Sequence, residues 1–303
     1  MSAAEAATRC GFVALIGAPN VGKSTLLNYL VGTKVSIVTH KVQTTRSRVR
    51  GIAMEGASQL VFVDTPGIFA PRRRLDRAMV AAAWAAVADT DAVVLLVDAA
   101  RPETDADTRA IVDGLKTRGK TAILALNKVD KVARSRLLSL AARFDAEGVF
   151  TRVFMISALT GDGVGDLRAM LAARAPAGPW LYPEDQAADV PLRQLAAEVT
   201  REKLFMRLHQ ELPYTLTVET DDWQEFDNGS ARIDQTVYVA RDTHKAICLG
   251  KGGRAIKAVR EAAQKELAAM LERPVHLFVH VKVRERWLED PARYRAWGLE
   301  FDV

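Results

Sequence analysis

The sequence predicts an α/β P-loop domain, a mostly parallel sheet with helices on both faces, followed by a smaller α+β domain. Three observations carry this prediction: a G-x-x-x-x-G-K-S motif between a strand and a helix, alternating strands and helices to about residue 175, and a proline-rich stretch that follows. A length of 303 residues favours two domains. We expect the first domain at 1–178, a linker at 179–191 and the second domain at 192–303.

A continuous apolar run such as Phe12–Ile16 is expected for a strand buried on both faces, and mostly apolar runs mark the strands of the first domain. They are Phe12–Ile16, Val49–Ala53, Leu60–Val63, Val93–Val97, Ala122–Leu126 and Arg152–Ile156, with helices near 22–31, 75–88, 104–118, 133–146 and 163–174. Ligands of such sheets bind at the carboxyl ends of the strands. The polar motifs that follow these strands are therefore the candidate site.

After the prolines of the linker, which favour a semi-rigid spacer, the order of elements changes. The expected elements are a helix at Leu192–Leu212, strands at Thr215–Gln224 and Arg232–Ala240, helices at Thr243–Leu249 and Ala255–Glu272, and a strand at Val275–Val283. Asp227-Asn228-Gly229 predicts a hairpin turn between the first two strands, because Asn and Gly accept positive φ.

The segment Gly17–Ser24 is a phosphate-binding loop. Its backbone N–H groups and the helix that follows direct positive potential at an anion. We expect Lys23 to neutralise the β- and γ-phosphates, as a catalytic residue, and the Ser24 hydroxyl to bind Mg²⁺. The residues of this loop expected to contact the nucleotide are Gly17, Asn20, Val21, Gly22, Lys23, Ser24 and Thr25.

The magnesium site is completed by two further segments. Asp64 follows a buried strand and would hold Mg²⁺, while Gly67 in the same Asp-Thr-Pro-Gly motif would sense the γ-phosphate and act in catalysis. A threonine of the polar segment Lys34–Arg50 would complete the metal shell when the γ-phosphate is present. We favour Thr45 over Thr44 for this metal-binding and catalytic role.

The base is read by Asn127-Lys128-Val129-Asp130. One carboxylate, Asp130, can accept from both N1–H and the exocyclic amine of guanine, and adenine offers no such pair. Asn127 would tie this segment to the phosphate loop, and the Lys128 stem would cover the base. Ser157-Ala158-Leu159 comes after the last strand, where the Ala158 N–H would meet the guanine carbonyl. The nucleotide is therefore expected to be GTP or GDP.

A glycine-rich loop in the second domain is a candidate RNA site. A G-x-x-G loop between two helices lets an RNA backbone approach without obstruction by Cβ atoms. Residues 241–295 hold 13 basic and 7 acidic residues, although residues 181–303 as a whole carry a charge of −3. The expected RNA-binding residues are Ile247, Gly250, Lys251, Gly252, Gly253, Arg254 and Ile256. His276 and His280 share one face of a strand and are expected to be surface or RNA-facing residues, not metal ligands.

These motifs resemble the translation-factor-related class of GTPases. Over residues 10–300 the chain is similar to the Era-like family of ribosome-assembly GTPases, through Gly17–Ser24, Gln43-Thr44-Thr45-Arg46, Asp64–Gly67, Asn127–Asp130, Glu211-Leu212-Pro213-Tyr214 and Pro274-Val275-His276-Leu277. The resemblance implies a second domain of the KH type with its helix first (type II). It also implies binding to the 3′ end of the small-subunit (16S) ribosomal RNA in assembly of the 30S subunit.

One absence concerns catalysis. Ile68 follows Gly67 where Ras-like enzymes carry the glutamine that orients water, so hydrolysis should be slow. In some relatives of this family an asparagine at the Asn20 position coordinates K⁺ in place of an arginine finger. We consider the same catalytic role for Asn20 here, the alternative being that Asn20 only shapes the loop.

The length of the apolar runs and the cysteine content bear on where in the cell the protein is expected to act. No apolar run approaches the roughly 20 residues of a membrane span, and Cys10 and Cys248 form no disulfide framework. We expect a cytoplasmic monomer, with weak attachment to a membrane surface reported for the family and Arg72-Arg73-Arg74 as a weak candidate for it. Two rival functions are a signalling GTPase whose second domain binds a protein, and an ATP-dependent enzyme.

Overall fold

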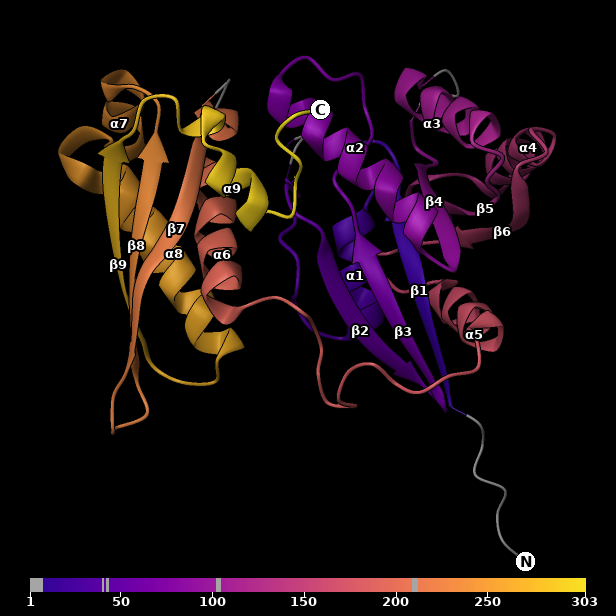
Figure 1. Cartoon of the computed structure of the whole chain (residues 1–303), viewed down its shortest axis with the longest axis horizontal. Helices are drawn as coiled ribbons and strands as arrows, with labels where there is room; N and C mark the ends of the chain where they lie inside the picture. The colour runs from indigo at the N-terminus through magenta and orange to yellow at the C-terminus, as the bar shows by residue number, and fades with distance from the viewer. Residues whose placement is uncertain (1–7, 40, 42–43, 102–104, 209–211) are drawn as a thin grey trace, which may run out of the picture. The chain divides into compact units, whose positions relative to one another are not determined.

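The computed structural model describes residues 8–39, 41, 44–101, 105–208 and 212–303. Its internal contacts divide the chain into two compact units (Figure 1). The first unit comprises residues 1–36, 45–189 and 295–303, and the second comprises 37–44 and 190–294. Gln43 and Glu211, which belong to motifs named above, lie outside the described residues.

The first unit contains a six-stranded sheet in the order β2-β3-β1-β4-β5-β6. Its strands are β1 Arg9–Ile16, β2 Val49–Glu55, β3 Ser58–Asp64, β4 Ala92–Asp98, β5 Ala122–Asn127 and β6 Phe150–Ile156. Only β2 pairs antiparallel among these described strands, on β3. The edge strand is reached by the short turn at Gly56, whereas every parallel pairing needs a longer crossover.

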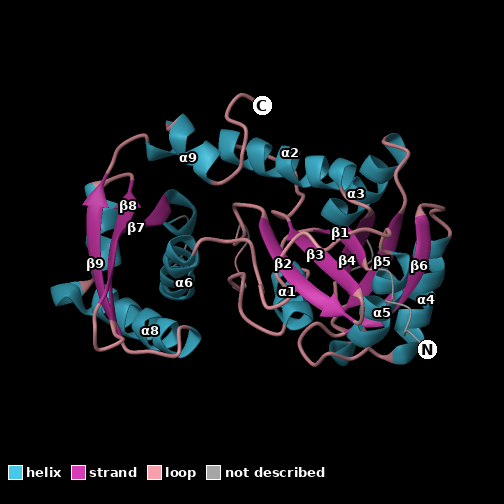
Figure 2. Ribbon diagram, turned by 60° about the horizontal axis from the view of Figure 1, so that its bottom comes forward, coloured by secondary structure: helices cyan, strands magenta, loops and turns pink. Residues whose placement is uncertain are grey.

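Helices cover both faces of this sheet, as Figure 2 shows. They are α1 Lys23–Val31, α2 Arg74–Asp89, α3 Ala106–Thr117, α4 Arg134–Asp145 and α5 Val164–Arg174, with a single 3₁₀ turn, η1, at Val129–Lys131. Burial on both faces explains why β3 is buried at every position and β4 at all but its first. The parallel strands share one carboxyl edge, to which Asp64, Asp98 and Asn127 belong.

Part of the proline-rich segment is hydrogen-bonded to the first unit and does not run free. The buried side chain of Gln59 accepts from the N–H groups of Leu181 and Tyr182 at 2.8 and 3.0 Å. Further along, the Asp189 N–H donates to the Arg50 carbonyl at 3.0 Å. These bonds account for the grouping of residues up to 189 with the first unit.

The second unit is a three-stranded sheet, β7-β8-β9, packed against helices. Its elements are α6 Leu192–Arg207, η2 Leu212–Thr215, β7 Leu216–Glu225, β8 Ala231–Val239, α7 Asp242–Leu249, η3 Lys251–Gly253, α8 Arg254–Met270, β9 Val275–Val283, η4 Trp287–Glu289 and α9 Pro291–Ala296. β7 pairs antiparallel and β9 parallel with β8. None of the helices in the described part of the chain combines the length and apolar character that a membrane span needs.

The largest difference between a predicted and an observed boundary is at the end of α6. The helix expected to reach Leu212 ends at Arg207, because Leu208 has extended dihedrals of φ −85° and ψ 147° that break the helical path. Leu208 is nevertheless 5% exposed and packs into the same core as Leu204 and Phe205. The apolar pattern therefore continues past the end of the helix, which is why it predicted a helix that was too long.

Candidate functional site

The carbonyl groups of residues 17–21 each accept a hydrogen bond from a side chain. Lys23 Nζ donates to the carbonyls of residues 17 and 18, both at 3.1 Å. Arg101 donates to that of residue 19, Lys128 Nζ to that of residue 20 at 2.9 Å, and Asn127 Nδ2 to that of residue 21 at 2.7 Å. In a trans peptide the carbonyl and the following N–H point in opposite directions. The N–H groups of residues 20–22 therefore point away from Arg101, Lys128 and Asn127, as a loop that binds an anion with its amides requires.

Two glycines allow the close approaches at this loop. Gly22 has φ 103°, and a Cβ there would lie 2.3 Å from Asn127 Nδ2. A Cβ on Gly67 would lie 3.0 Å from the backbone nitrogen of Pro19. The next residue, Ile68, donates its N–H to the Gly17 carbonyl at 3.1 Å and buries its side chain. The structure thus brings the Asp-Thr-Pro-Gly segment directly against the phosphate loop.

Asp64 lies at the end of β3 in a cluster of hydroxyl groups. Its Oδ2 accepts from Ser24 Oγ at 2.7 Å, from Ser36 Oγ at 3.0 Å and from Thr45 Oγ1 at 3.3 Å. Ser24 Oγ and Thr45 Oγ1 are 3.0 Å apart. Thr44 instead bonds to Thr39 and to the Lys41 carbonyl, so the geometry favours Thr45 at the predicted metal site.

The donor set at Asp64 fits a magnesium ion. Asp64 is fully buried, and its Oδ1 has no hydrogen-bond partner among the described residues. Burial raises the pKa of its carboxyl group, while Lys23 and the three hydroxyls act to lower it. A buried carboxylate oxygen without a described partner, beside three hydroxyl groups, offers the oxygen ligands that Mg²⁺ prefers.

The ammonium group of Lys23 is the charge that a phosphate would meet. Burial lowers the pKa of Lys23 to about 8, Asp64 acts to raise it, and the nearby Arg101 lowers it further. A bound phosphate would offset the burial and favour the charged form. A bound anion would therefore stabilise the positive charge of Lys23, which burial disfavours.

The base-recognition segments meet at the ends of β5 and β6. Asp130 is exposed, and its Oδ1 accepts from the buried Ser157 hydroxyl at 2.7 Å. The Ala158 N–H, expected to face a guanine carbonyl, donates here to Asn127 Oδ1 at 2.9 Å. Leu159 is 73% exposed and contributes an apolar surface at this edge. The structure brings all the predicted base-contacting residues to one edge, with Asp130 open to a ligand.

The glycine loop of the second unit joins α7 to α8. Gly250, Gly252 and Gly253 have φ of 69°, 60° and 75°, and added Cβ atoms on Gly252 and Gly253 would meet open space. Lys251 and Arg254 are exposed at this turn. The loop thus presents an unobstructed backbone with two basic side chains beside the first turn of α8.

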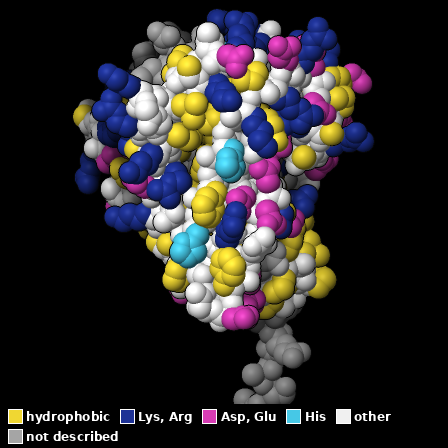
Figure 3. Space-filling model, turned by 90° about the vertical axis from the view of Figure 1, so that its left-hand side faces the viewer, with side chains coloured by type: hydrophobic (Ala, Val, Ile, Leu, Met, Phe, Trp, Pro, Cys, Tyr) yellow, Lys and Arg dark blue, Asp and Glu magenta, His cyan; other side chains and the backbone are white. Residues whose placement is uncertain are grey.

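The apolar residues expected to line an RNA groove differ in their surroundings. Ile247 on α7 is 56% exposed, whereas Ile256 on α8 is half-buried against the core of the unit. Figure 3 views the side on which α7 and β9 lie, and dark-blue basic side chains are abundant in its upper part. His276 and His280 are exposed on β9, and no cluster of metal-ligating His, Cys, Asp or Glu side chains occurs among the described residues.

Two family models match this chain. A family model described as 50S ribosome-binding GTPase matches residues 12–128, and a KH domain model matches residues 211–288. GTPase Era of Sinorhizobium medicae is 60% identical over 301 residues, which cover 99% of this chain and 96% of that protein. GTPase Era of Dinoroseobacter shibae is 60% identical over 304 residues, with coverages of 99% and 98%. The chain belongs to the Era family of GTPases. The predicted family is thereby confirmed.

Solved structures of the Era family share the whole fold. A variant of Aquifex aeolicus Era bound to GDP and AlF₄⁻ aligns with a TM-score of 0.89 at 36% identity, covering 96% of this chain and 99% of that one. Era in complex with MgGDPNP and nucleotides 1506–1542 of 16S ribosomal RNA aligns equally well. These likenesses confirm the predicted fold class of a P-loop GTPase domain followed by a KH domain, and the protein is a GTPase.

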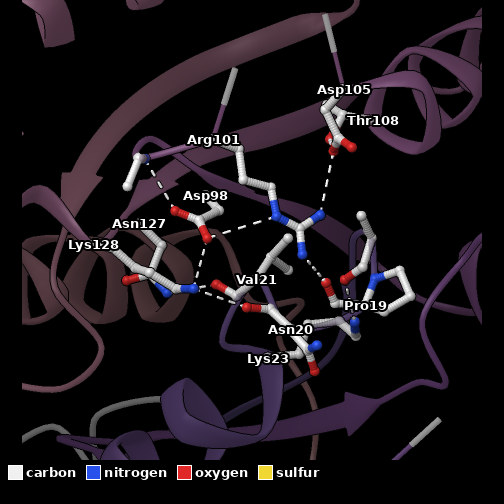
Figure 4. A network of polar contacts seen from close by, with 12 residues as sticks. Pro19, Asn20, Val21, Lys23, Asp98, Arg101, Asp105, Thr108, Asn127 and Lys128 are labelled. Carbon is white, nitrogen blue, oxygen red and sulfur yellow. Dashed lines mark hydrogen bonds and ion pairs between the residues drawn. The ribbon is translucent and has the colours of Figure 1, made fainter. Parts of the chain in front are cut away.

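Three polar residues at the nucleotide site of this Era family member were not predicted from the sequence. Ser36 joins the hydroxyls around Asp64, while Asp98 and Arg101 lie beside the phosphate loop (Figure 4). Asp98 could have been predicted from the sequence, because it is a polar residue at the carboxyl end of the apolar strand β4. Arg101 carried none, because its partner is a backbone carbonyl 82 positions away.

Proposed function

We propose that this protein binds the 3′ end of small-subunit ribosomal RNA in a GTP-dependent manner and acts in assembly of the 30S subunit. The observation that carries the proposal is the open Gly250–Gly253 loop, with positive φ at each of its three glycines and basic neighbours, in the same chain as a guanine-nucleotide site. The aligned Era complex with a 16S RNA fragment supports the same RNA class.

In this proposal residues 1–178 form the nucleotide-binding domain, 179–191 the linker and 192–303 the RNA-binding domain. Ser24, Thr45 and Asp64 would hold Mg²⁺, which would supply positive charge to offset the negative charge of the transferred phosphoryl group. Lys23 and the amides of the phosphate loop bind the β- and γ-phosphates. Hydrolysis is slow because Ile68 offers no hydrogen bond to water.

The segment between Ser36 and Thr45 is the proposed link between nucleotide and RNA. Ser36 and Thr45 both bond to Asp64. Residues 37–44 between them belong to the second unit, in which the Val38 N–H donates to Glu202 at 2.8 Å. Ordering of this segment by the γ-phosphate and Mg²⁺ would therefore act directly on the second unit.

The test of the proposal is nucleotide-dependent binding to a 16S 3′-end RNA. We expect a higher affinity with a non-hydrolysable GTP analogue than with GDP. A signalling GTPase whose second domain binds a protein would show no affinity for this RNA in either state. We place the protein in the cytoplasm as a monomer, with membrane-surface attachment left to a vesicle-binding assay.

Asn20 is proposed to bind K⁺ during hydrolysis. Asn20 has φ 63°, and Lys128 holds its carbonyl, so its side chain belongs to a fixed loop conformation. We expect kcat to be several-fold higher in K⁺ than in Na⁺. Asn20→Gly keeps the left-handed conformation and removes the amide, so the difference between the two salts should disappear while affinity for GDP is kept. Equal rates in K⁺ and Na⁺ for the wild-type protein would leave Asn20 with a loop-shaping role only.

A further inference from the structure

Arg101 follows β4 and makes polar contacts on three sides (Figure 4). Its Nη2 donates to the Pro19 carbonyl in the phosphate loop. Its Nε lies 3.7 Å from Asp98 Oδ2, and its Nη1 donates to Asp105 Oδ2 at 3.4 Å. The side chain is 28% exposed and is therefore held mostly inside the protein. Two carboxylates thus fix a guanidinium group against the phosphate loop.

This contact sets the orientation of one peptide group. Pro19 has no N–H, so the only hydrogen-bonding group that it offers is the carbonyl that Arg101 holds. The same trans peptide carries the Asn20 N–H on its opposite side. Arg101 therefore turns the Asn20 N–H toward the side on which the loop binds phosphate. A charged donor on the carbonyl also polarises the peptide and strengthens its N–H as a donor.

We propose that Arg101 is a positioning residue for GTP hydrolysis, which orients and polarises the Pro19–Asn20 peptide so that the Asn20 N–H stabilises charge on the reacting phosphates. Arg101 does not touch the nucleotide in this role. Among the described side chains that donate to the carbonyls of residues 17–21, it alone lies outside the segments Gly17–Ser24 and Asn127–Asp130. The proposal rests on the GTPase activity and not on the RNA partner.

Asp98 contacts both Arg101 and Lys128, which belongs to the base-recognition segment. Its Oδ2 accepts from Lys128 Nζ at 2.6 Å and faces the Arg101 Nε. Lys128 in turn holds the Asn20 carbonyl, the next acceptor along the loop. The buried Asp98 carboxylate therefore offsets the repulsion between Arg101 and Lys128. These two cations donate to the successive carbonyls of residues 19 and 20. Replacing Arg101 would remove the hydrogen bond to the Pro19 carbonyl and leave the Lys128–Asp98 ion pair in place.

The expected effect is larger on the rate than on binding. A preorganised N–H donor acts most strongly where charge develops in the transition state, and removal of a direct donor costs about 100-fold or more in kcat. Because Arg101 acts through the peptide, we expect Arg101→Ala to lower kcat by roughly tenfold and to weaken GDP binding by less than about threefold. Arg101→Lys keeps a charged donor and should recover part of the rate.

The experiment compares Arg101→Ala, Arg101→Lys and the control Arg109→Ala. Arg109 is 49% exposed on α3 and pairs with Glu147, so its removal should leave kcat unchanged. Each variant is measured for kcat, KM, GDP affinity, melting temperature and the ¹H–¹⁵N resonance of Asn20. The proposal expects a shifted Asn20 resonance in Arg101→Ala, an unchanged ratio of K⁺ to Na⁺ rates, and partial rescue by Lys. An unchanged kcat, an equal loss of rate and GDP affinity, or no rescue by Lys would each overturn it.

Discussion

Replacing both Gly252 and Gly253 by Asp should abolish specific binding of the 16S 3′-end RNA and leave GTP hydrolysis intact. The two positions have φ of 60° and 75°, which cost an aspartate of the order of 1 kcal/mol each, and they add two negative charges beside Lys251. Carboxylates where RNA phosphates approach repel them and cancel the basic neighbours. We expect the affinity to fall by about 100-fold or more, equivalent to about 2.7 kcal/mol.

The matched control for this change is Asn228→Asp with Gly229→Asp. Gly229 also has a positive φ, 79°, with open space around its Cβ position, and it lies in the same unit at the β7–β8 turn. The control therefore adds the same charge away from the loop, at one position of positive φ and not two. Fluorescence anisotropy with a labelled RNA fragment measures both variants. Unchanged affinity in the loop variant would favour the rival in which the second domain binds a protein.

Changing Asp130 to Asn should transfer the preference from guanine to xanthine nucleotides. Guanine offers two neighbouring donors to the exposed Asp130 carboxylate, whereas xanthine replaces the amine by an acceptor that an Asn amide can match. The Ser157 hydroxyl that bonds to Asp130 Oδ1 can bond to an amide oxygen in the same way. We expect GTP affinity to fall by about 100-fold or more while XTP affinity rises.

Asp162→Asn is the control for this specificity change, because Asp162 lies beyond the same β6 edge and bonds to Thr160. It should leave the preference for GTP unchanged. Competition of GTP, XTP and ATP against a fluorescent nucleotide provides the measurement. A wild-type protein that prefers ATP, or an Asp130→Asn variant that gains no XTP affinity, would contradict guanine recognition by this carboxylate.

The order of strands and helices could be predicted from the sequence because the central strands β1, β3, β4 and β5 each contain a continuous apolar run. The nucleotide site could be predicted as well, since Gly17–Ser24, Asp64 and Asn127–Asp130 all follow such strands. The end of α6 could not, because Leu208 continues the apolar pattern in an extended conformation. Apolar periodicity reports which residues face a core and not where a helix ends.

The contacts between segments far apart in the sequence were the least predictable part. Gln59 belongs to none of the predicted motifs or strands, yet its side chain accepts hydrogen bonds from the backbone of residues 181 and 182. Arg101 belongs to the same class, since its partner is a main-chain carbonyl that no residue type reveals. Polar side chains that bond to backbone carry no complementary signal in the sequence of their partner.

The most direct test of the central claim is the affinity of the protein for a 16S 3′-end RNA fragment, measured at one salt concentration with a GTP analogue and with GDP. Coupling between two sites is a free energy, and a coupling of about 1–3 kcal/mol corresponds to a roughly 5- to 150-fold difference in affinity. We predict that the protein binds the RNA at least about fivefold more tightly with the GTP analogue than with GDP. Equal affinity in the two nucleotide states would contradict it.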